Sequence, residues 1–180
     1  NYVLVPGDRA AGIPATSERG ATPGDPPSNT AELLSASLTD SNLAGGTFIL
    51  QAFYSRTDDV FGGGVFGTFQ DPRIDPSRTL FDQSANQSRK LGGKVSYERG
   101  VPGFEDLVVT VGADALFDRT QQILAQTDRV WVPETDFRSI APFVQGNLSL
   151  AGDLVRLAGG LRYENVELSV GDYETLFSYG

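Results

Sequence analysis

The feature that most constrains this chain is a strict alternation of apolar and polar residues, clearest in the stretch LVRLAGGLRYENVEL from Leu154 to Leu168. One set of alternate positions is apolar and includes Val155, Leu157 and Leu161. The other set carries two arginines and a glutamate among small residues. Successive side chains of a β-strand point to opposite faces, so this period predicts a strand with one apolar and one wet face.

The same alternation recurs along the chain, which predicts an all-β fold of about six to seven antiparallel, up-and-down strands. One region, 117–126, could instead form a helical turn. The further alternating stretches are 46–57, 91–99, 107–120, 139–150 and, more weakly, 29–40.

The expected connections between strands alternate in length. The short ones read SNLAGG, GVPGFED and AGD, whereas the long ones span 58–88 and 121–137. Consecutive antiparallel strands then place short turns at one end of the sheet and long loops at the other. That asymmetry is typical of outer-membrane β-barrels, which have short periplasmic turns and long extracellular loops. We therefore expect part of a transmembrane barrel in the cell outer membrane of a Gram-negative bacterium, in contact with lipid.

The free-energy cost of placing a charge in hydrocarbon determines which face of each predicted strand contacts water. An arginine at the midplane of such a barrel costs about 2–4 kcal/mol, so the charged set must line the lumen. The alternative is a soluble antiparallel sheet in which the apolar set forms an ordinary core. The residues expected to face the lumen are Asp114, Asp118, Arg156, Arg162 and Glu164.

Composition excludes several kinds of protein. The net charge of −9 argues against a nucleic-acid partner, because a phosphate backbone calls for a basic surface. The chain has no cysteine and no histidine, which removes thiolate catalysis, the Ser-His-Asp triad and imidazole or thiolate metal sites. Catalysis by a carboxylate pair or by a lysine nucleophile remains open on composition alone. We nevertheless expect no enzyme, no catalytic residue, no metal site and no cofactor.

Six strands and a fragment cannot close a large barrel, and open sheet edges do not survive in lipid. The whole range 1–180 is therefore expected to be an internal piece of one barrel domain. In this interpretation 1–30 holds a strand end and an extracellular loop, and 58–88 and 121–137 are further long extracellular loops.

Several segments together resemble the middle of the barrel of a TonB-dependent ferric-siderophore receptor. They are FGGGVFGTFQDPRIDPSRTLFDQSANQSRKLGGKVSYER, RVWVPETDFRSIAPFVQGNLSL and DLVRLAGGLRYENVELSVGDYETL, and the similarity covers about 31–180. The resemblance implies a 22-stranded barrel with an N-terminal plug, and import of a ferric siderophore driven by the TonB complex. The segments of that family that form the plug and contact TonB are not in this sequence, and the iron would arrive already chelated.

Aromatic and basic residues in the two long loops are candidates for contact with such a ligand. Aromatic faces can cover its apolar parts and guanidinium groups can pair with its anionic oxygens. Packing of the loops against themselves would explain the same residues. The candidates are Phe66, Phe69, Arg73, Arg129 and Trp131.

Three other motifs have simpler explanations. Gly62, Gly64 and Gly67 satisfy G-x-G-x-x-G, but the prolines that follow forbid the helix that a dinucleotide site needs. Asp114 and Asp118 could act as an acid–base pair, yet a hydrogen-bonded polar wall explains them better. The aspartates near 58–75 lack the D-x-D-x-D-G pattern of a calcium loop.

Two other functions remain open from the sequence. One is a passive, porin-like barrel in the same membrane. The other is a soluble β-sheet module that binds carbohydrate or mediates adhesion.

Overall fold

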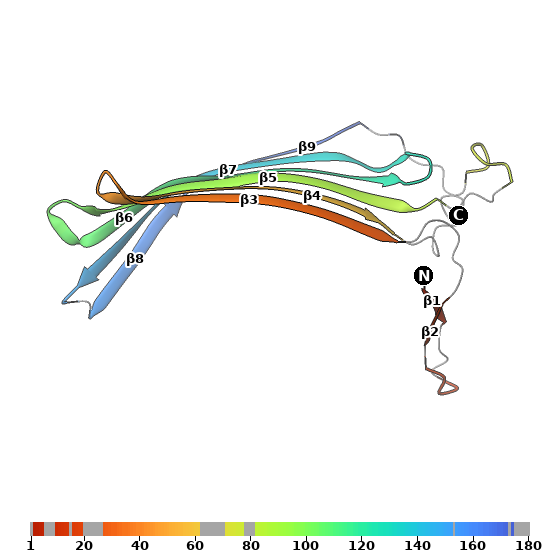
Figure 1. Cartoon of the computed structure of the whole chain (residues 1–180), viewed down its shortest axis with the longest axis horizontal. Helices are drawn as coiled ribbons and strands as arrows, with labels where there is room; N and C mark the ends of the chain where they lie inside the picture. The colour runs from red at the N-terminus through yellow and green to blue at the C-terminus, as the bar shows by residue number, and fades with distance from the viewer. Residues whose placement is uncertain are drawn as a thin grey trace.

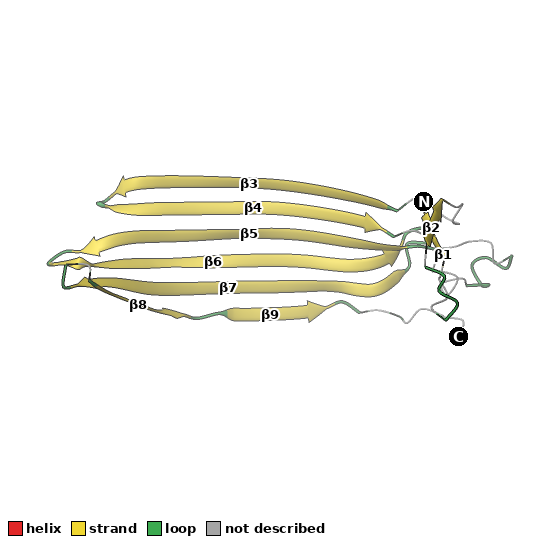
Figure 2. Cartoon of the chain, turned by 90° about the horizontal axis from the view of Figure 1, so that it is seen from below, coloured by secondary structure: helices red, strands yellow, loops and turns green. Residues whose placement is uncertain are grey.

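The computed structural model describes residues 2–5, 10–14, 16–19, 27–61, 71–77, 82–152, 154–172 and 174. Within these ranges the secondary structure is entirely β, as the alternation predicts. Seven strands form one antiparallel sheet that is not closed (Figure 2). They are β3 (Ser28–Leu43), β4 (Gly46–Val60), β5 (Ser84–Val101), β6 (Phe104–Leu124), β7 (Val130–Leu150), β8 (Val155–Arg162) and β9 (Asn165–Val170).

The strands follow one another in chain order across the sheet, from β3 to β8, so the topology is up-and-down. Tight turns join them at one end, on the left of Figure 1. Two of these turns, Ala44–Gly45 and Ala151–Gly152, have positive φ at both central residues. This is the type I′ geometry, whose twist matches that of the flanking strands. No helix in the described part of the chain is long and apolar enough to cross a membrane.

At the opposite end the structure corrects one expected loop. The segment 121–137 is mostly strand, because β6 continues to Leu124 and β7 already begins at Val130. The run VWV has high β-propensity, and Pro133 lies near a shift in register, where a missing N–H is tolerated. Only residues 125–129 connect these two strands, so the helical turn considered for 117–126 is absent too.

In the first thirty residues the structure has a short strand where the sequence predicts a strand end, and a second strand inside the expected loop. β1 (Tyr2–Val5) pairs with β2 (Thr16–Arg19) in a separate two-stranded antiparallel sheet. β3 then begins at Ser28.

β8 and β9 lie end to end along the same side of β7 and keep a single register with it. Between them, Tyr163 donates its backbone N–H to the carbonyl of Pro142 at 3.0 Å. Proline has no N–H to donate in return, so the ladder is incomplete at this point. The two segments therefore act as one long strand that is interrupted opposite Pro142.

The register assigns each strand residue to one of two faces, which we call the apolar face and the polar face. Val155, Leu157 and Leu161 pair with apolar residues of β7, whereas Arg156 and Arg162 lie on the opposite face, as the alternation predicts. Leu161 is 78% exposed. Further large residues on the apolar face are Leu34, Leu38, Leu50, Tyr54, Leu91, Val95, Val111, Phe117, Ile140, Val144 and Leu148.

No second layer covers the apolar face within the described ranges. The buried apolar residues found there are Ala85, Leu124 and Ala141 alone. β3 on one edge, and β8 and β9 on the other, are exposed throughout. The sheet therefore lacks the packed partner layer on which a soluble domain depends.

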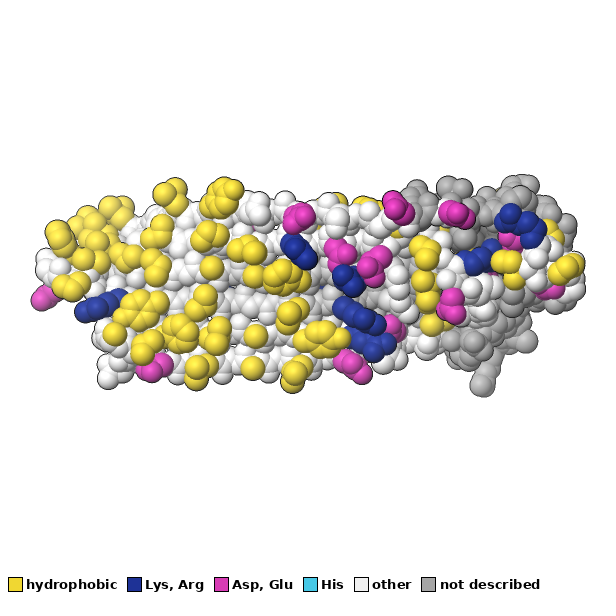
Figure 3. Space-filling view, turned by 90° about the horizontal axis from the view of Figure 1, so that it is seen from above, with side chains coloured by type: hydrophobic (Ala, Val, Ile, Leu, Met, Phe, Trp, Pro, Cys, Tyr) yellow, Lys and Arg dark blue, Asp and Glu magenta, His cyan; other side chains and the backbone are white. Residues whose placement is uncertain are grey.

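A belt of charged residues crosses the apolar face and separates its main apolar area from a shorter apolar row nearer the loops (Figure 3). Most of the apolar residues gather on the turn side of this line, and a shorter apolar row of Val60, Ala85, Ile123 and Val130 lies beyond it. The belt contains residues of β3 to β7 and of β9. We call these residues the charged belt: Glu32, Arg56, Asp58, Arg89, Arg119, Glu134, Asp136, Arg138 and Glu167.

Two phenylalanines on the polar face lie directly over glycines of the neighbouring strand. Phe53 faces Gly92, and Phe143 faces Gly112. A Cβ at Gly112 would lie 2.5 Å from the carbonyl oxygen of Val95 and 2.6 Å from the Phe143 ring. The missing side chain therefore allows the ring to pack flat on the sheet.

We predict that Gly112→Ala destabilises the sheet by about 1–3 kcal/mol, the usual cost of overpacking. Gly146→Ala is the matched control, since its Cβ would meet only a Leu107 methyl at 3.8 Å. Urea unfolding of the full-length protein in detergent, followed by heat-modifiable gel migration, measures both. Equal midpoints for the two variants would refute the packing argument.

Candidate functional site

The polar face carries a cluster of paired charges centred on Asp114. Arg162 of β8 binds this carboxylate in a bidentate manner, at 2.5 and 2.8 Å. Lys94 of β5 lies directly opposite Asp114 on the other side. The Lys94 ammonium also lies 5.2 Å from the centroid of the Phe143 ring. The Asp114 carboxylate therefore links β6 to β8, and Lys94 of β5 lies opposite it.

Two further contacts extend this cluster along the strands. Lys90 pairs with Asp118 at 3.1 Å, four residues nearer the loop end on each strand. Glu164 accepts a hydrogen bond from the Ser139 hydroxyl at 2.6 Å and lies 4.0 Å from Arg162. All of the residues predicted to face a lumen lie on this polar face. Among them, Arg156 lies opposite Ser149, near the turn.

Two open hollows adjoin these charges and share Lys94 and Asp114 as lining residues. One, of about 600 Å³, reaches from Phe53 to Leu116. The other, of about 490 Å³, reaches from Phe143 to Arg162. Each of these carboxylates lies within 4.0 Å of a cation, so the arrangement can hold polar solutes by hydrogen bonding but is poorly suited to acid–base catalysis.

At the loop end, a second network joins the two connections 61–83 and 125–129. Asp82 is fully buried and accepts hydrogen bonds from the Gln126 backbone N–H at 2.9 Å and from the Thr127 hydroxyl. Arg129 adds an ion pair to Asp82 at 3.2 Å. Burying a carboxylate is tolerable only when it is paired and hydrogen-bonded in this way.

Gln83 completes this network, and it too is fully buried. Its backbone N–H donates to the Gln126 side-chain oxygen at 2.7 Å, and its own amide donates to the Phe61 carbonyl at 2.8 Å. The Gln126 amide donates back to the Gln83 side chain. We call Asp71, Asp82, Gln83, Gln126 and Arg129 the loop clasp.

Asp71 ties the outer part of the longer loop to this clasp. Its buried carboxylate binds Arg73 at 2.6 Å and lies 3.7 Å from Arg129. The hydrogen bond from the Arg73 side chain is the main cause that lowers the pKa of Asp71 to about 2, and the charge of Arg129 acts in the same direction.

The five residues predicted to contact a ligand therefore have different environments. Arg73 is exposed, with 68% of its side chain accessible. Trp131 of β7, the single tryptophan of the sequence, is 40% exposed. Arg129 is 16% exposed and contributes to the clasp. Phe66 and Phe69 lie outside the described residues.

Sequence reasoning missed two parts of these networks. Lys90 and Lys94 belong to the same alternating set as the predicted wall residues, so the register of β5 against β6 could have found them. Asp82 had no comparable signal, because its burial depends on the distant residues 126–129. Among the described residues, no group of three or more carboxylates is arranged to hold a metal ion.

Comparison with known proteins assigns neither a family nor a related structure to this chain. No protein-family model matches this chain, and no solved structure matches it.

We predict that Asp82→Asn loosens the loop clasp by about 1.5–3 kcal/mol, the scale of a hydrogen bond to a charged group. The amide cannot neutralise Arg129 or accept all the hydrogen bonds that the carboxylate accepts. Hydrogen exchange of residues 125–129 in the full-length protein reports the opening. Asp128→Asn, an exposed change in the same connection, should leave exchange unchanged. Identical protection in both variants would contradict this role of Asp82.

The lowered pKa of Asp71 also makes the clasp sensitive to pH. Because the folded pKa lies below the ordinary value of 3.8, ionised Asp71 stabilises the loop fully above that value. The stabilisation is lost as the pH falls from there towards 2. Hydrogen exchange of 71–77, corrected for intrinsic rates, should rise across this window. Asp71→Asn should abolish the pH step; a step that persists in this variant would assign it to another group.

Proposed function

We propose that this chain forms part of the wall of an outer-membrane β-barrel that imports a ferric siderophore. The observation that carries the proposal is the uncovered apolar face, whose main apolar area lies between the turns and the charged belt (Figure 3). Ten residue steps separate Leu107 from Phe117 on β6, which corresponds to about 34 Å along a strand and about 25 Å across a membrane at the usual tilt. This matches the height of the apolar band of an outer-membrane barrel.

The open edges support a closed assembly with further strands. β3 and the β8–β9 line leave their outer backbone groups without a strand partner in the described part of the chain. Lipid cannot hydrogen-bond these groups, so a membrane wall requires more strands to complete a barrel. A sheet of this length exposed to water would instead invite edge-to-edge aggregation.

The polar face has the character that the inside of such a barrel needs. Its charges are paired across neighbouring strands, as in the Asp114–Arg162 and Lys90–Asp118 pairs, so the wall is hydrophilic without a large excess of either sign. The loop clasp holds two connections together at one end of the sheet, where a ligand would first arrive.

The nature of the ligand and the source of energy rest on the resemblance to TonB-dependent ferric-siderophore receptors. In that interpretation the partners are the siderophore chelate, the lipid around the barrel and the TonB complex. The exposed Arg73 would meet an anionic oxygen of the chelate, and Trp131 would cover an apolar part of it.

We predict that Arg73→Ala combined with Trp131→Ala weakens ferric-siderophore binding by roughly tenfold or more, the loss of about one hydrogen bond to a charged group. Titration of the purified full-length protein measures the affinity, and heat-modifiable gel migration checks folding. The matched control is Arg99→Ala with Phe104→Ala, which removes the same kinds of side chain at the turn end. Unchanged affinity in the folded Arg73/Trp131 variant would remove these loops from the ligand site.

A further inference from the structure

Three arginines of the charged belt stand side by side on adjacent strands. The register places Arg56 of β4 directly opposite Arg89 of β5, and Arg89 directly opposite Arg119 of β6. Side chains in such positions have their Cβ atoms about 4.5–5.5 Å apart, and like charges placed directly opposite destabilise a sheet. Negative charges near the three guanidinium groups are needed to offset this repulsion.

The carboxylates of the belt hold only the two outer arginines. Arg56 pairs with Asp58 at 2.7 Å, and Arg119 pairs with Asp136 at 2.7 Å and with Glu134 at 3.5 Å. Arg89, between them, forms no hydrogen bond or ion pair with any described residue, and its side chain is exposed. The row therefore presents one unneutralised guanidinium flanked by two that are fixed in place.

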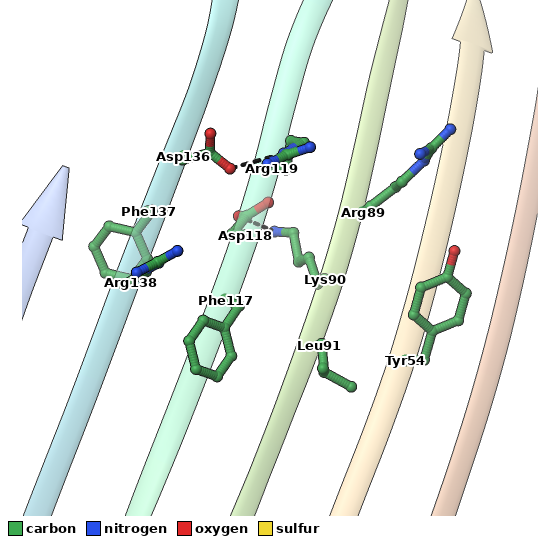
Figure 4. A pocket seen from close by; sticks show the side chains of 10 residues that line it. All are labelled: Tyr54, Arg89, Lys90, Leu91, Phe117, Asp118, Arg119, Asp136, Phe137 and Arg138. Atoms are coloured by element: carbon green, nitrogen blue, oxygen red, sulfur yellow. Dashed lines mark hydrogen bonds and ion pairs between the residues drawn. The ribbon is translucent and has the colours of Figure 1, made fainter. Parts of the chain in front are cut away.

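An apolar row lies directly beside the arginines on the same face. Two residues nearer the turns, Leu91 of β5 lies opposite Tyr54 of β4 and Phe117 of β6. The two rows border a shallow hollow of about 210 Å³, shown in Figure 4. In that view Tyr54, Leu91 and Phe117 lie on one side and Arg89 and Arg119 on the other.

We propose that this junction binds the phosphate-bearing headgroup of an anionic lipid. The phosphate would be held by Arg89 together with its two neighbours, and the acyl chains would lie on Leu91 and Phe117. The inference rests on the proposed function, in which the apolar face contacts lipid. Charge complementarity favours an anion, and the continuous apolar surface below it favours a lipid over a free phosphate, which would use only the arginine row.

The test measures lipid adducts on the full-length protein by native mass spectrometry, with phosphatidylglycerol and phosphatidylcholine of identical acyl chains. We expect phosphatidylglycerol to bind preferentially, and Arg89→Gln to weaken that binding roughly tenfold without changing phosphatidylcholine binding. Arg99→Gln, an exposed arginine of the same strand near the turn, should have no effect. Millimolar inorganic phosphate should not displace the lipid; displacement would overturn the lipid assignment.

Stability gives a second, independent measurement. In phosphatidylcholine nanodiscs Arg89→Gln should raise the melting temperature, because it removes the repulsion between adjacent guanidinium groups. In nanodiscs that contain phosphatidylglycerol the same change should lower it. Equal shifts in both lipids, or no lipid preference in a protein that inserts normally, would refute the headgroup site alone. Failure of the protein to insert into either bilayer would instead refute the proposed function.

Discussion

An uncovered apolar face is the constraint on which the rest of this structure depends. A folded sheet gains most of its stability by removing one face from water against a second layer. Here the described chain supplies no such layer, although residues such as Leu91, Leu157 and Leu161 are more than half exposed on that face. In the function proposed above, lipid covers this face, and the usual height of the apolar band of an outer-membrane barrel matches the distance from the turns to the charged belt.

The remaining features follow from that division of the two faces. The charged belt interrupts the apolar sets at one height, where Arg56, Arg89 and Arg119 lie opposite one another on three strands. The polar face can then hold charges at the same depth as the apolar band, provided that they pair across strands, as Asp114 does with Arg162. Phe53 and Phe143 pack onto glycines of the neighbouring strands on this face. At the loop end, the buried Asp82 and Gln83 supply the only fully buried large polar side chains of the described chain.

Much of the sheet could be predicted because it depends on local pattern. Alternation specifies strands and faces, and the turns AG at 44–45 and 151–152 favour tight hairpins, so the up-and-down order follows from chain order. The loop end could not be predicted in the same way. The chain 121–137 has polar glutamines that resemble a loop, yet Gln121 pairs with Gln87 across the sheet, and only the register shows this. The clasp depends on contacts between residues more than forty positions apart, such as Asp82 and Gln126, which no local pattern encodes.

The most direct test of the account is nitroxide accessibility along the central strand β6. This sequence has no cysteine, so single cysteines can be placed at each position from Val109 to Phe117 in a cysteine-free form of the full-length protein, reconstituted in vesicles. The account predicts that labels at odd positions collide with oxygen dissolved in the lipid, whereas labels at even positions, including Asp114, collide with a water-soluble nickel chelate. Equal access of the nickel chelate to both sets of positions would contradict a lipid-facing apolar face.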